Sequence, residues 1–327
     1  MDPIPGTEFT STIGRTPLVR LARIGAGLPC PVYGKAEIFN PGASIKDRIA
    51  RAMIETAEAE GKLVPGKSTV VEATAGNTGV GLAIMAALRG YRCIFVMPEK
   101  MSREKIRLLR AYGAEVVITP AGAPAGSPDD YNQVAKRIVR DTEGAWLADQ
   151  FHNAVNPRTH ETTTGPEIWE QTEGKVTCFV AGVGTGGTLT GVGRFLKAKN
   201  PQVRIVGADP EGSILAKGGQ AGSWLVEGIG EDYVPDTFDP DVVDEWIVVS
   251  DAEGFQTARR VARTEGLLVG GSSGVILSAA LRFARQLSPE DLVVAVLPDT
   301  GRNYLSKIFD DDWMRAKGLV PEEGDCR

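Results

Sequence analysis

The chain has 327 residues, a formal net charge of −6 and 42% hydrophobic residues, enough for two domains with buried cores. The acidic balance argues against nucleic acid as a partner. No apolar run approaches the roughly 18 residues of a membrane helix, and no basic-then-apolar signal opens the chain, so we expect a cytoplasmic protein that does not bind membranes.

The first residues of the chain are excluded from the fold prediction. Residues 6–9, Gly-Thr-Glu-Phe, resemble a cloning scar, and we leave residues 1–9 out of the fold prediction.

The four cysteines lack a CxxC spacing and there are only two histidines, so neither a metal site nor a disulfide scaffold is expected. We expect both histidines, His152 and His160, to be structural.

Helical periods and short apolar runs alternate along the chain. Ile45, Ile49 and Met53 repeat every fourth residue, and Gly61 ends this predicted helix. Residues 77–88 are apolar nearly all round, which indicates a buried helix. A third helix has an apolar face over residues 189–196 and stops at Asn200-Pro201. Buried strands are predicted at residues 94–97, 115–118, 177–181, 204–208 and 292–297.

This alternation predicts an α/β fold with parallel sheets. We expect a smaller, mobile N-terminal domain over residues 40–150 that carries a substrate loop. A larger domain would combine residues 10–39 with residues 151–312, followed by a C-terminal tail over residues 313–327. Residues 121–130 are rich in Gly, Pro, Ser and Asp, which is typical of a surface loop.

A lysine at a predicted helix start is the first candidate for chemistry. Lys46 follows the turn-forming segment NPGASI at residues 40–45. Such a segment suits a side chain that must be held in one orientation. An amine held in this way can bond to an aldehyde, as pyridoxal phosphate requires.

The glycine-rich loop GVGTGGT, residues 182–188, lies between a predicted strand and a predicted helix. Its glycines fit the dinucleotide fingerprint GxGxxG, and Asp209 stands where a ribose-binding acid would be, so a NAD-dependent dehydrogenase is one interpretation. The loop is denser in glycine and threonine than that fingerprint needs, which favours one terminal phosphate. A turn that only packs the helix is the third interpretation, and we rank it below phosphate binding.

A second loop, VEATAGNTG at residues 71–79, also runs from a strand into a helix. Small polar side chains and free backbone N–H groups at a helix start suit a carboxylate. Plain capping by Asn77 or Thr78 is the alternative. Capping needs only one such residue, so the cluster favours a ligand.

Together these motifs resemble the fold-type II pyridoxal-phosphate family of cysteine synthase and cystathionine β-synthase. The resemblance covers roughly residues 11–310. It includes TIGRTPL at residues 12–18, the three segments above, GIG at 228–230, GGSSG at 270–274 and Pro298-Asp299. It implies a tryptophan synthase β-like fold, in which two open twisted α/β domains hold the cofactor between them.

The resemblance also implies a role for each matching residue, with pyridoxal 5′-phosphate as cofactor and no haem. Lys46 would bind the cofactor aldehyde and then remove the Cα proton of the substrate. Asn77 would bind the 3′ oxygen of the cofactor, and Ser272 would partner its pyridine nitrogen. The phosphate ligands would be Gly184, Thr185, Gly186, Gly187 and Thr188. The substrate-binding residues would be Thr74, Ala75, Gly76, Thr78, Gln150, Gly228 and Glu231.

Two positions depart from the family pattern. Ala75 stands where the family usually has serine, which removes one hydroxyl near the substrate carboxylate. Glu231 stands where animal cystathionine β-synthases have tyrosine. Our hypothesis is that Glu231 attracts the ammonium of an incoming thiol amino acid. A solvated loop carboxylate is the alternative interpretation.

The function that the resemblance implies is β-replacement on serine or an activated serine through an aminoacrylate. Segments 98–102, 210–216, 226–230 and 297–304 are more similar to cystathionine β-synthase, so serine plus homocysteine is our first choice. Cysteine synthase, using O-acetylserine and sulfide, and release of hydrogen sulfide from cysteine are alternatives. Outside this class stand the dehydrogenase and a catalytically dead binding module. The expected partners are small-molecule amino acids and, since relatives are dimers, a second copy of the chain.

Overall fold

The computed structural model describes residues 8–319, except residues 75, 100–102, 121–122 and 125. The chain divides into two compact units. The first unit comprises Met1–Ile13, Asn40–Gly42 and Lys46–Asn156, and the second comprises Gly14–Phe39, Ala43–Ile45 and Pro157–Arg327.

The first unit contains a parallel four-stranded sheet with strand order β5-β4-β3-β6. Its strands are β3 (Thr69–Ala73), β4 (Arg92–Pro98), β5 (Glu115–Thr119) and β6 (Ala145–Leu147). Its helices are α1 (Lys46–Ala59), α2 (Asn77–Arg89), α3 (Arg103–Ala111) and α4 (Tyr131–Asp141).

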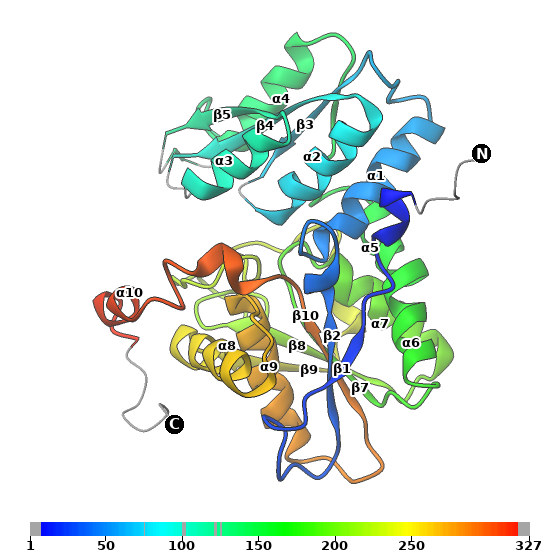
Figure 1. The fold of residues 1–327 in the computed structure, drawn as a ribbon, viewed down its shortest axis with the longest axis vertical. Helices are drawn as coiled ribbons and strands as arrows, with labels where there is room; N and C mark the ends of the chain where they lie inside the picture. Colours follow the sequence, from blue (N-terminus) through cyan, green and yellow to red (C-terminus); the bar gives the residue numbers. More distant parts are fainter. Residues whose placement is uncertain (1–7, 75, 100–102, 121–122, 125, 320–327) are drawn as a thin grey trace, which may run out of the picture. The chain divides into compact units, whose positions relative to one another are not determined.

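Both faces of this sheet are covered because apolar side chains on its strands point to alternate sides. Phe95 and Met97 of β4 join a core with residues of α1 and α2, whereas Ile94 and Val96 join a second core with Val134 of α4. Figure 1 shows α4 on one side of the sheet and α2 and α3 on the other. The continuous apolar run of β4 is therefore explained by burial on both sides.

The second unit contains a six-stranded sheet with strand order β1-β2-β10-β7-β8-β9, in which only β1 pairs antiparallel. Its strands are β1 (Leu18–Arg20), β2 (Val32–Ala36), β7 (Cys178–Gly182), β8 (Arg204–Pro210), β9 (Glu245–Val249) and β10 (Val293–Leu297). Its longer helices are α7 (Gly187–Lys199), α8 (Asp251–Glu265) and α9 (Gly271–Ala284).

Shorter helices complete the chain. They are α5 (Val155–Thr159), a π-helical turn at His160–Thr164, α6 (Gly165–Gln171), α10 (Asp311–Ala316) and 3₁₀ turns at Phe9–Thr12, Glu37–Phe39, Pro240–Val242 and Gly301–Tyr304. In the second unit, Cys178 and Val180 of β7 join a core with α8 and α9, and Phe179 joins another with α7. Helices thus cover both faces here as well.

The predicted elements are present with small shifts at their ends. All five predicted strands are confirmed as β4, β5, β7, β8 and β10, and the three predicted helices as α1, α2 and α7. Asn200 is the C-cap of α7, as its position before Pro201 predicts. The strands β1, β2, β6 and β9 were not predicted. β1 and β6 have only three residues each, and Gly34 and Lys35 interrupt the apolar run of β2. β9 does carry an apolar run, WIVV at residues 246–249, which the prediction missed.

Two segments differ from the sequence-based expectation. The predicted tail begins at residue 313, yet α10 spans Asp311–Ala316, and its Met314 is completely buried. The predicted loop ends at Asp130, which is 7% exposed and caps α4 by accepting a hydrogen bond from the Asn132 N–H. Three residues of that loop lie outside the described residues. Among the described residues, none of the helices has the length and apolar character needed to cross a bilayer.

Candidate active site

Three long helices begin at the predicted motifs, and all three begin without a side-chain cap. The N-cap residues of α2, α7 and α9 are Gly76, Gly186 and Gly270. By contrast, side chains of Asp130, Ser250 and Asp310 cap α4, α8 and α10. An uncapped helix start presents unpaired N–H groups and a partial positive charge. The motifs thus provide three helix starts at which a ligand can take the place of the missing cap.

Two glycines of the glycine-rich loop have no room for a side chain, because neighbouring residues lie directly against them. A Cβ on Gly184 would collide with the carbonyl oxygen of Gly228, and a Cβ on Gly186 would collide with Phe238. Gly186 also has φ +80°, a left-handed conformation that glycine adopts readily. The Thr237 hydroxyl donates a hydrogen bond to the Thr185 carbonyl and braces the loop. This cradle at the start of α7 fits a terminal phosphate group.

His160 lies against the same loop and contacts one of its threonines. Its side chain is completely buried, with Nε2 3.2 Å from Thr188 Oγ1 and Nδ1 2.8 Å from Thr164 Oγ1. The imidazole therefore fixes the hydroxyl of a predicted phosphate ligand. His152 is different, because its Nδ1 lies 2.7 Å from Asp149 Oδ1 and its side chain is half exposed.

The start of α9 carries two buried hydroxyls. Ser272 is 4% exposed, and Ser273 is fully buried with no partner for its hydroxyl within the described part of the chain. A Cβ on Gly270 would collide with the carboxylate of Asp299, so the backbone is packed tightly there. A hydroxyl at this position can donate to or accept from a ring nitrogen, which fits the predicted role of Ser272.

Lys46 is the first residue of α1 and is partly buried. The next residue, Asp47, is buried and accepts a 2.5 Å hydrogen bond from the Gly42 N–H, which closes the turn before the helix. Helix α1 packs directly on α2, where Gly81 lies against Lys46 and Ala50. The lysine is thus set at the end of a rigid packed element, as the turn-forming segment predicts.

The second loop places buried polar side chains at the start of α2. Thr74, Thr78 and Gln150 are all at most 6% exposed. The Thr78 hydroxyl donates a 2.6 Å hydrogen bond to the Gln150 amide oxygen, which leaves the amide nitrogen as the donor toward a ligand. The Gly76 N–H points to Thr74 Oγ1 at 3.2 Å. Asn77 is the first residue of α2, and Ala75 lies outside the described residues.

Glu231 has a fixed backbone in the second unit. Its N–H donates to Ser213 Oγ at 3.1 Å, and its carbonyl accepts from the Ile214 N–H at 3.1 Å. Gly228, three residues earlier, has φ +88° and contributes the carbonyl that faces Gly184. The segment with Gly228 and Glu231 is therefore held against the phosphate loop.

Asp209 does not support the dinucleotide interpretation. Its carboxylate is fully buried, and its Oδ2 accepts a 2.9 Å hydrogen bond from the Ala216 N–H. Burial raises the pKa of this carboxyl. A ribose-binding acid must present its oxygens to the ligand, whereas Asp209 uses one to hold the turn after β8.

The structure groups the predicted residues within each unit. Lys46, Thr74, Gly76, Asn77, Thr78 and Gln150 belong to the first unit, and Gly184, Thr185, Gly186, Gly187, Thr188, Gly228, Glu231 and Ser272 belong to the second. Direct contacts join Thr78 to Gln150 and Gly184 to Gly228.

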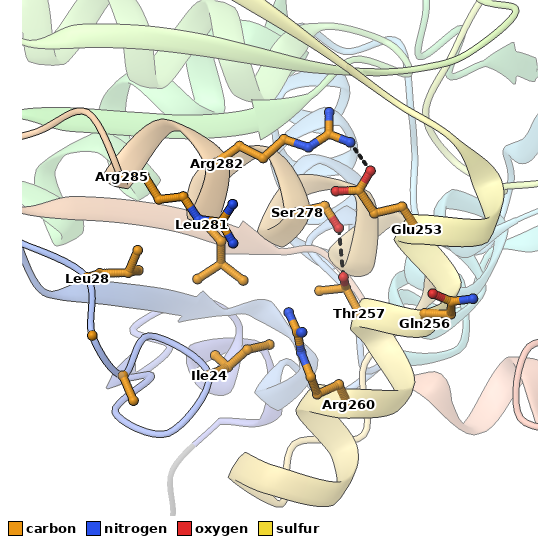
Figure 2. Close-up of a pocket in the computed structure, with 12 residues that line it drawn as sticks. Ile24, Leu28, Glu253, Gln256, Thr257, Arg260, Ser278, Leu281, Arg282 and Arg285 are labelled. Atoms are coloured by element: carbon orange, nitrogen blue, oxygen red, sulfur yellow. Dashed lines mark hydrogen bonds and ion pairs between the residues drawn. The ribbon is translucent and has the colours of Figure 1, made fainter. Parts of the chain in front are cut away.

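A cavity of about 550 Å³ in the second unit is distinct from these residues. It is lined by the loop around Ile24 and Leu28 and by side chains of α8 and α9. Figure 2 shows Arg282 paired with Glu253 and Ser278 with Thr257 in its wall. None of the predicted site residues that the structure describes lines this cavity, so it is not the candidate active site.

The fold and the three open helix starts define a pyridoxal-phosphate enzyme of fold type II. The model of the family "Pyridoxal-phosphate dependent enzyme" matches residues 9–299, and the chain therefore belongs to this family. The fold class and the cofactor predicted from the sequence are confirmed, and the NAD-dependent dehydrogenase alternative is wrong.

Several named proteins are similar in sequence to nearly the whole length of this chain. Cystathionine beta-synthase of Mus musculus is 48% identical over 97% of this chain and 57% of its own length. The Saccharomyces cerevisiae enzyme of that name is 43% identical over 95% of this chain and 64% of its own length. The chain thus spans less than two thirds of these relatives. A solved structure of a hydrogen sulfide-producing enzyme from Fusobacterium nucleatum has a TM-score of 0.85 and 34% identity, covering 92% of this chain and 99% of that one.

Neither Glu72 nor Thr237 had a predicted role, and His160 was expected to be structural. The contact of His160 with Thr188 has no local signal, because the two residues are 28 positions apart. Glu72 does have a weak local signal in the sequence, since it is a lone acid within the apolar strand β3. A charged residue in a buried strand needs a partner, and the structure supplies it.

Proposed function

We propose that the chain catalyses β-replacement on serine or an activated serine, and that its first substrate pair is serine and homocysteine, giving cystathionine. The observation that carries this proposal is the open start of α2 with the Thr78–Gln150 pair, which suits the α-carboxylate of an amino acid. The names of the relatives at 43% and 48% identity support the choice of thiol.

The bound pyridoxal phosphate supplies the electron sink that makes the substrate Cα–H acidic. The N–H groups at the start of α7, with the hydroxyls of Thr185 and Thr188, would hold its phosphate. Ser272 would meet its ring nitrogen and Asn77 its 3′ oxygen. A neutral hydroxyl at the ring nitrogen would leave that nitrogen largely unprotonated, which would favour loss of a β substituent over reactions that need a long-lived carbanion.

The residues of the first unit would then act on the substrate. Thr74, Ala75, Gly76, Thr78 and Gln150 would bind the α-carboxylate and fix the orientation of Cα. Lys46 Nζ, after it has released the cofactor aldehyde, would take the Cα proton as a general base. The β-hydroxyl would leave as water with the proton that Lys46 took from Cα. The thiol would lose its proton to Lys46 as its sulfur bonds to the β-carbon, and Lys46 would pass that proton back to Cα.

Two related activities follow from the same residues. O-acetylserine with sulfide would give cysteine, with acetate as the leaving group. Cysteine as the first substrate would release hydrogen sulfide, and the similarity to a hydrogen sulfide-producing enzyme over 99% of that chain favours this second activity. We further propose small-molecule amino-acid substrates, a homodimer and a cytoplasmic location, with no nucleic acid or membrane partner. The net charge of −6 supports the absence of nucleic acid.

Product analysis tests the proposal. The purified protein, reconstituted with pyridoxal phosphate, is mixed with serine or O-acetylserine and then with homocysteine, cysteine or sulfide, and products are identified by mass. Cystathionine from serine and homocysteine is the expected main product, and it should disappear in Lys46→Ala. A protein that shows the cofactor's visible band but makes none of these thioether or thiol products would overturn the proposal.

A further inference from the structure

Glu72 is a buried acid next to the proposed carboxylate site. It lies on β3, and its side chain is 2% exposed. Its Oε2 accepts a 2.7 Å hydrogen bond from the Asp149 N–H, and its Oε1 accepts a 3.3 Å hydrogen bond from the Gln150 N–H. The carboxyl therefore holds two successive backbone groups of the segment that carries Gln150.

The Glu72 carboxyl accepts the backbone N–H groups that come directly after the pairing of β3 with β6 ends. Strand β6 ends at Leu147, and the last backbone hydrogen bond to β3 runs from the Ala148 N–H to the Val71 carbonyl. Asp149 then adopts φ +51°, a left-handed conformation that is uncommon outside glycine. This turn takes the next two N–H groups out of the sheet ladder, and Glu72 satisfies both.

Gln150 is consequently fixed on three sides. Glu72 holds its N–H, the side-chain amide of Asn156 donates to its carbonyl at 2.9 Å, and Thr78 donates to its side-chain oxygen at 2.6 Å. The Gln150 amide nitrogen is the one group of this residue left to meet a ligand among the interactions of the described residues.

We propose that Glu72 is a positioning residue for the substrate carboxylate, which holds Gln150 opposite Thr78 at the open start of α2. This inference deepens the proposed function and rests on its assignment of the carboxylate to that helix start. A purely structural acceptor for these two N–H groups would weaken the fold when replaced, but it would not discriminate between ligands with and without a carboxylate. Burial and the nearby charge of Asp149 raise the pKa of Glu72 to about 8, against the two N–H groups that lower it.

The test compares two ligands of the reconstituted enzyme, glycine with a carboxylate and ethanolamine without one. Binding of each is read from the visible band of the cofactor. Glu72→Gln keeps the volume but replaces one acceptor oxygen by an NH₂ group, which cannot accept from an N–H. We expect the Kd of glycine to rise about tenfold, the scale of one hydrogen bond, and that of ethanolamine to change less than about twofold.

Asp130→Asn is the matched control. Asp130 is also a buried acid of the first unit that accepts two backbone N–H groups, from Gly126 and Asn132. Among the hydrogen bonds of the described residues, none joins Asp130 to a predicted site residue. Its variant should lose thermal stability without changing the ratio of the two Kd values. Equal weakening of glycine and ethanolamine in Glu72→Gln, or the same ratio change in Asp130→Asn, would overturn the inference.

A double-mutant cycle shows whether Glu72 acts through Gln150. In a Gln150→Ala background, Glu72→Gln should have no further effect on glycine binding, whereas independent roles would give additive losses. Hydrogen exchange of the cofactor-free chain should show faster exchange at residues 149–150 in Glu72→Gln. Should that variant fail to fold, Glu72→Asp keeps a carboxyl group but withdraws it from the two N–H groups, and the same glycine-specific loss is expected. A wild-type enzyme that binds glycine but makes no cystathionine would refute the proposed function and leave this inference standing.

Discussion

Gly81 of α2 lies so close to Ala50 of α1 that a Cβ added to it would stand 2.8 Å from the Ala50 Cβ and 3.2 Å from the Lys46 carbonyl. The two helices that carry the lysine and the substrate loop are thus in contact through a position without a side chain. The absence of a side chain at one residue sets the distance between two parts of the proposed site.

Gly81→Ala should lower the free energy of unfolding by about 1 kcal/mol. Overpacking costs about 1–3 kcal/mol, and the better helix propensity of alanine returns about 1 kcal/mol. kcat should fall as well, because α1 must shift with Lys46. Adding Ala50→Gly to Gly81→Ala should restore part of the lost stability and part of the lost kcat. Ala50→Gly alone should destabilise α1. Urea unfolding and steady-state kinetics of the four proteins measure this coupling.

Lys46→Ala should abolish turnover, with a loss of about 10³-fold or more, because it removes both the covalent attachment of the cofactor and the base. Borohydride treatment of the wild-type holoenzyme should label the peptide that contains Lys46, as peptide mass mapping will show. Lys62→Ala, which removes an exposed lysine of the same unit, should leave kcat and the labelled peptide unchanged. Labelling of any other lysine contradicts the assignment.

Gly186→Ala should weaken cofactor binding and destabilise the chain. Gly186 has φ +80° and lies against Phe238, so strain of about 1 kcal/mol adds to a clash of about 1–3 kcal/mol. Gly266 is a matched control, since it has φ +72° and no atom within 4 Å of an added Cβ. Gly266→Ala should show only the strain and an unchanged Kd for pyridoxal phosphate. Thermal unfolding with and without the cofactor, together with fluorescence titration, separates the two effects.

Glu231→Ala should raise the KM of the thiol amino acid several-fold with little change in the KM of serine. The reason is the loss of a carboxylate that attracts the substrate ammonium, an interaction worth about 1 kcal/mol when partly exposed. Sulfide carries no ammonium, so its KM should not change, and it serves as the internal control. Equal KM values for homocysteine in both proteins would leave Glu231 as a solvated loop residue.

The stability of the chain should depend on pH through Glu72. Its pKa is raised from 4.5 to about 8, so between these values the folded chain holds a proton that the unfolded chain has lost. The free energy of unfolding should therefore fall as the pH rises from about 4.5 to about 8. In Glu72→Gln this fall should be smaller. Urea unfolding at about pH 5, 6.5 and 8 measures the slope, and identical slopes would contradict the assignment.

Much of the fold followed from local patterns. The strands β4, β7 and β10 are buried on both faces, so their apolar runs were recognisable, and α2 was visible for the same reason. The motif around Lys46 and the glycine-rich loop indicated a covalent cofactor and a phosphate because turn-forming residues and glycines have few other uses at a helix start.

The amino-acid sequence by itself determined the α/β class, the pyridoxal-phosphate family and the elements on which the site residues stand. Only the tertiary structure decided which distant groups support them. Glu72 meets Gln150 across 78 positions, and His160 meets Thr188 across 28. Spacing along a chain reports which residues share a helix or strand face. Contacts between elements depend on how the strands pair and the helices pack, which no local period records.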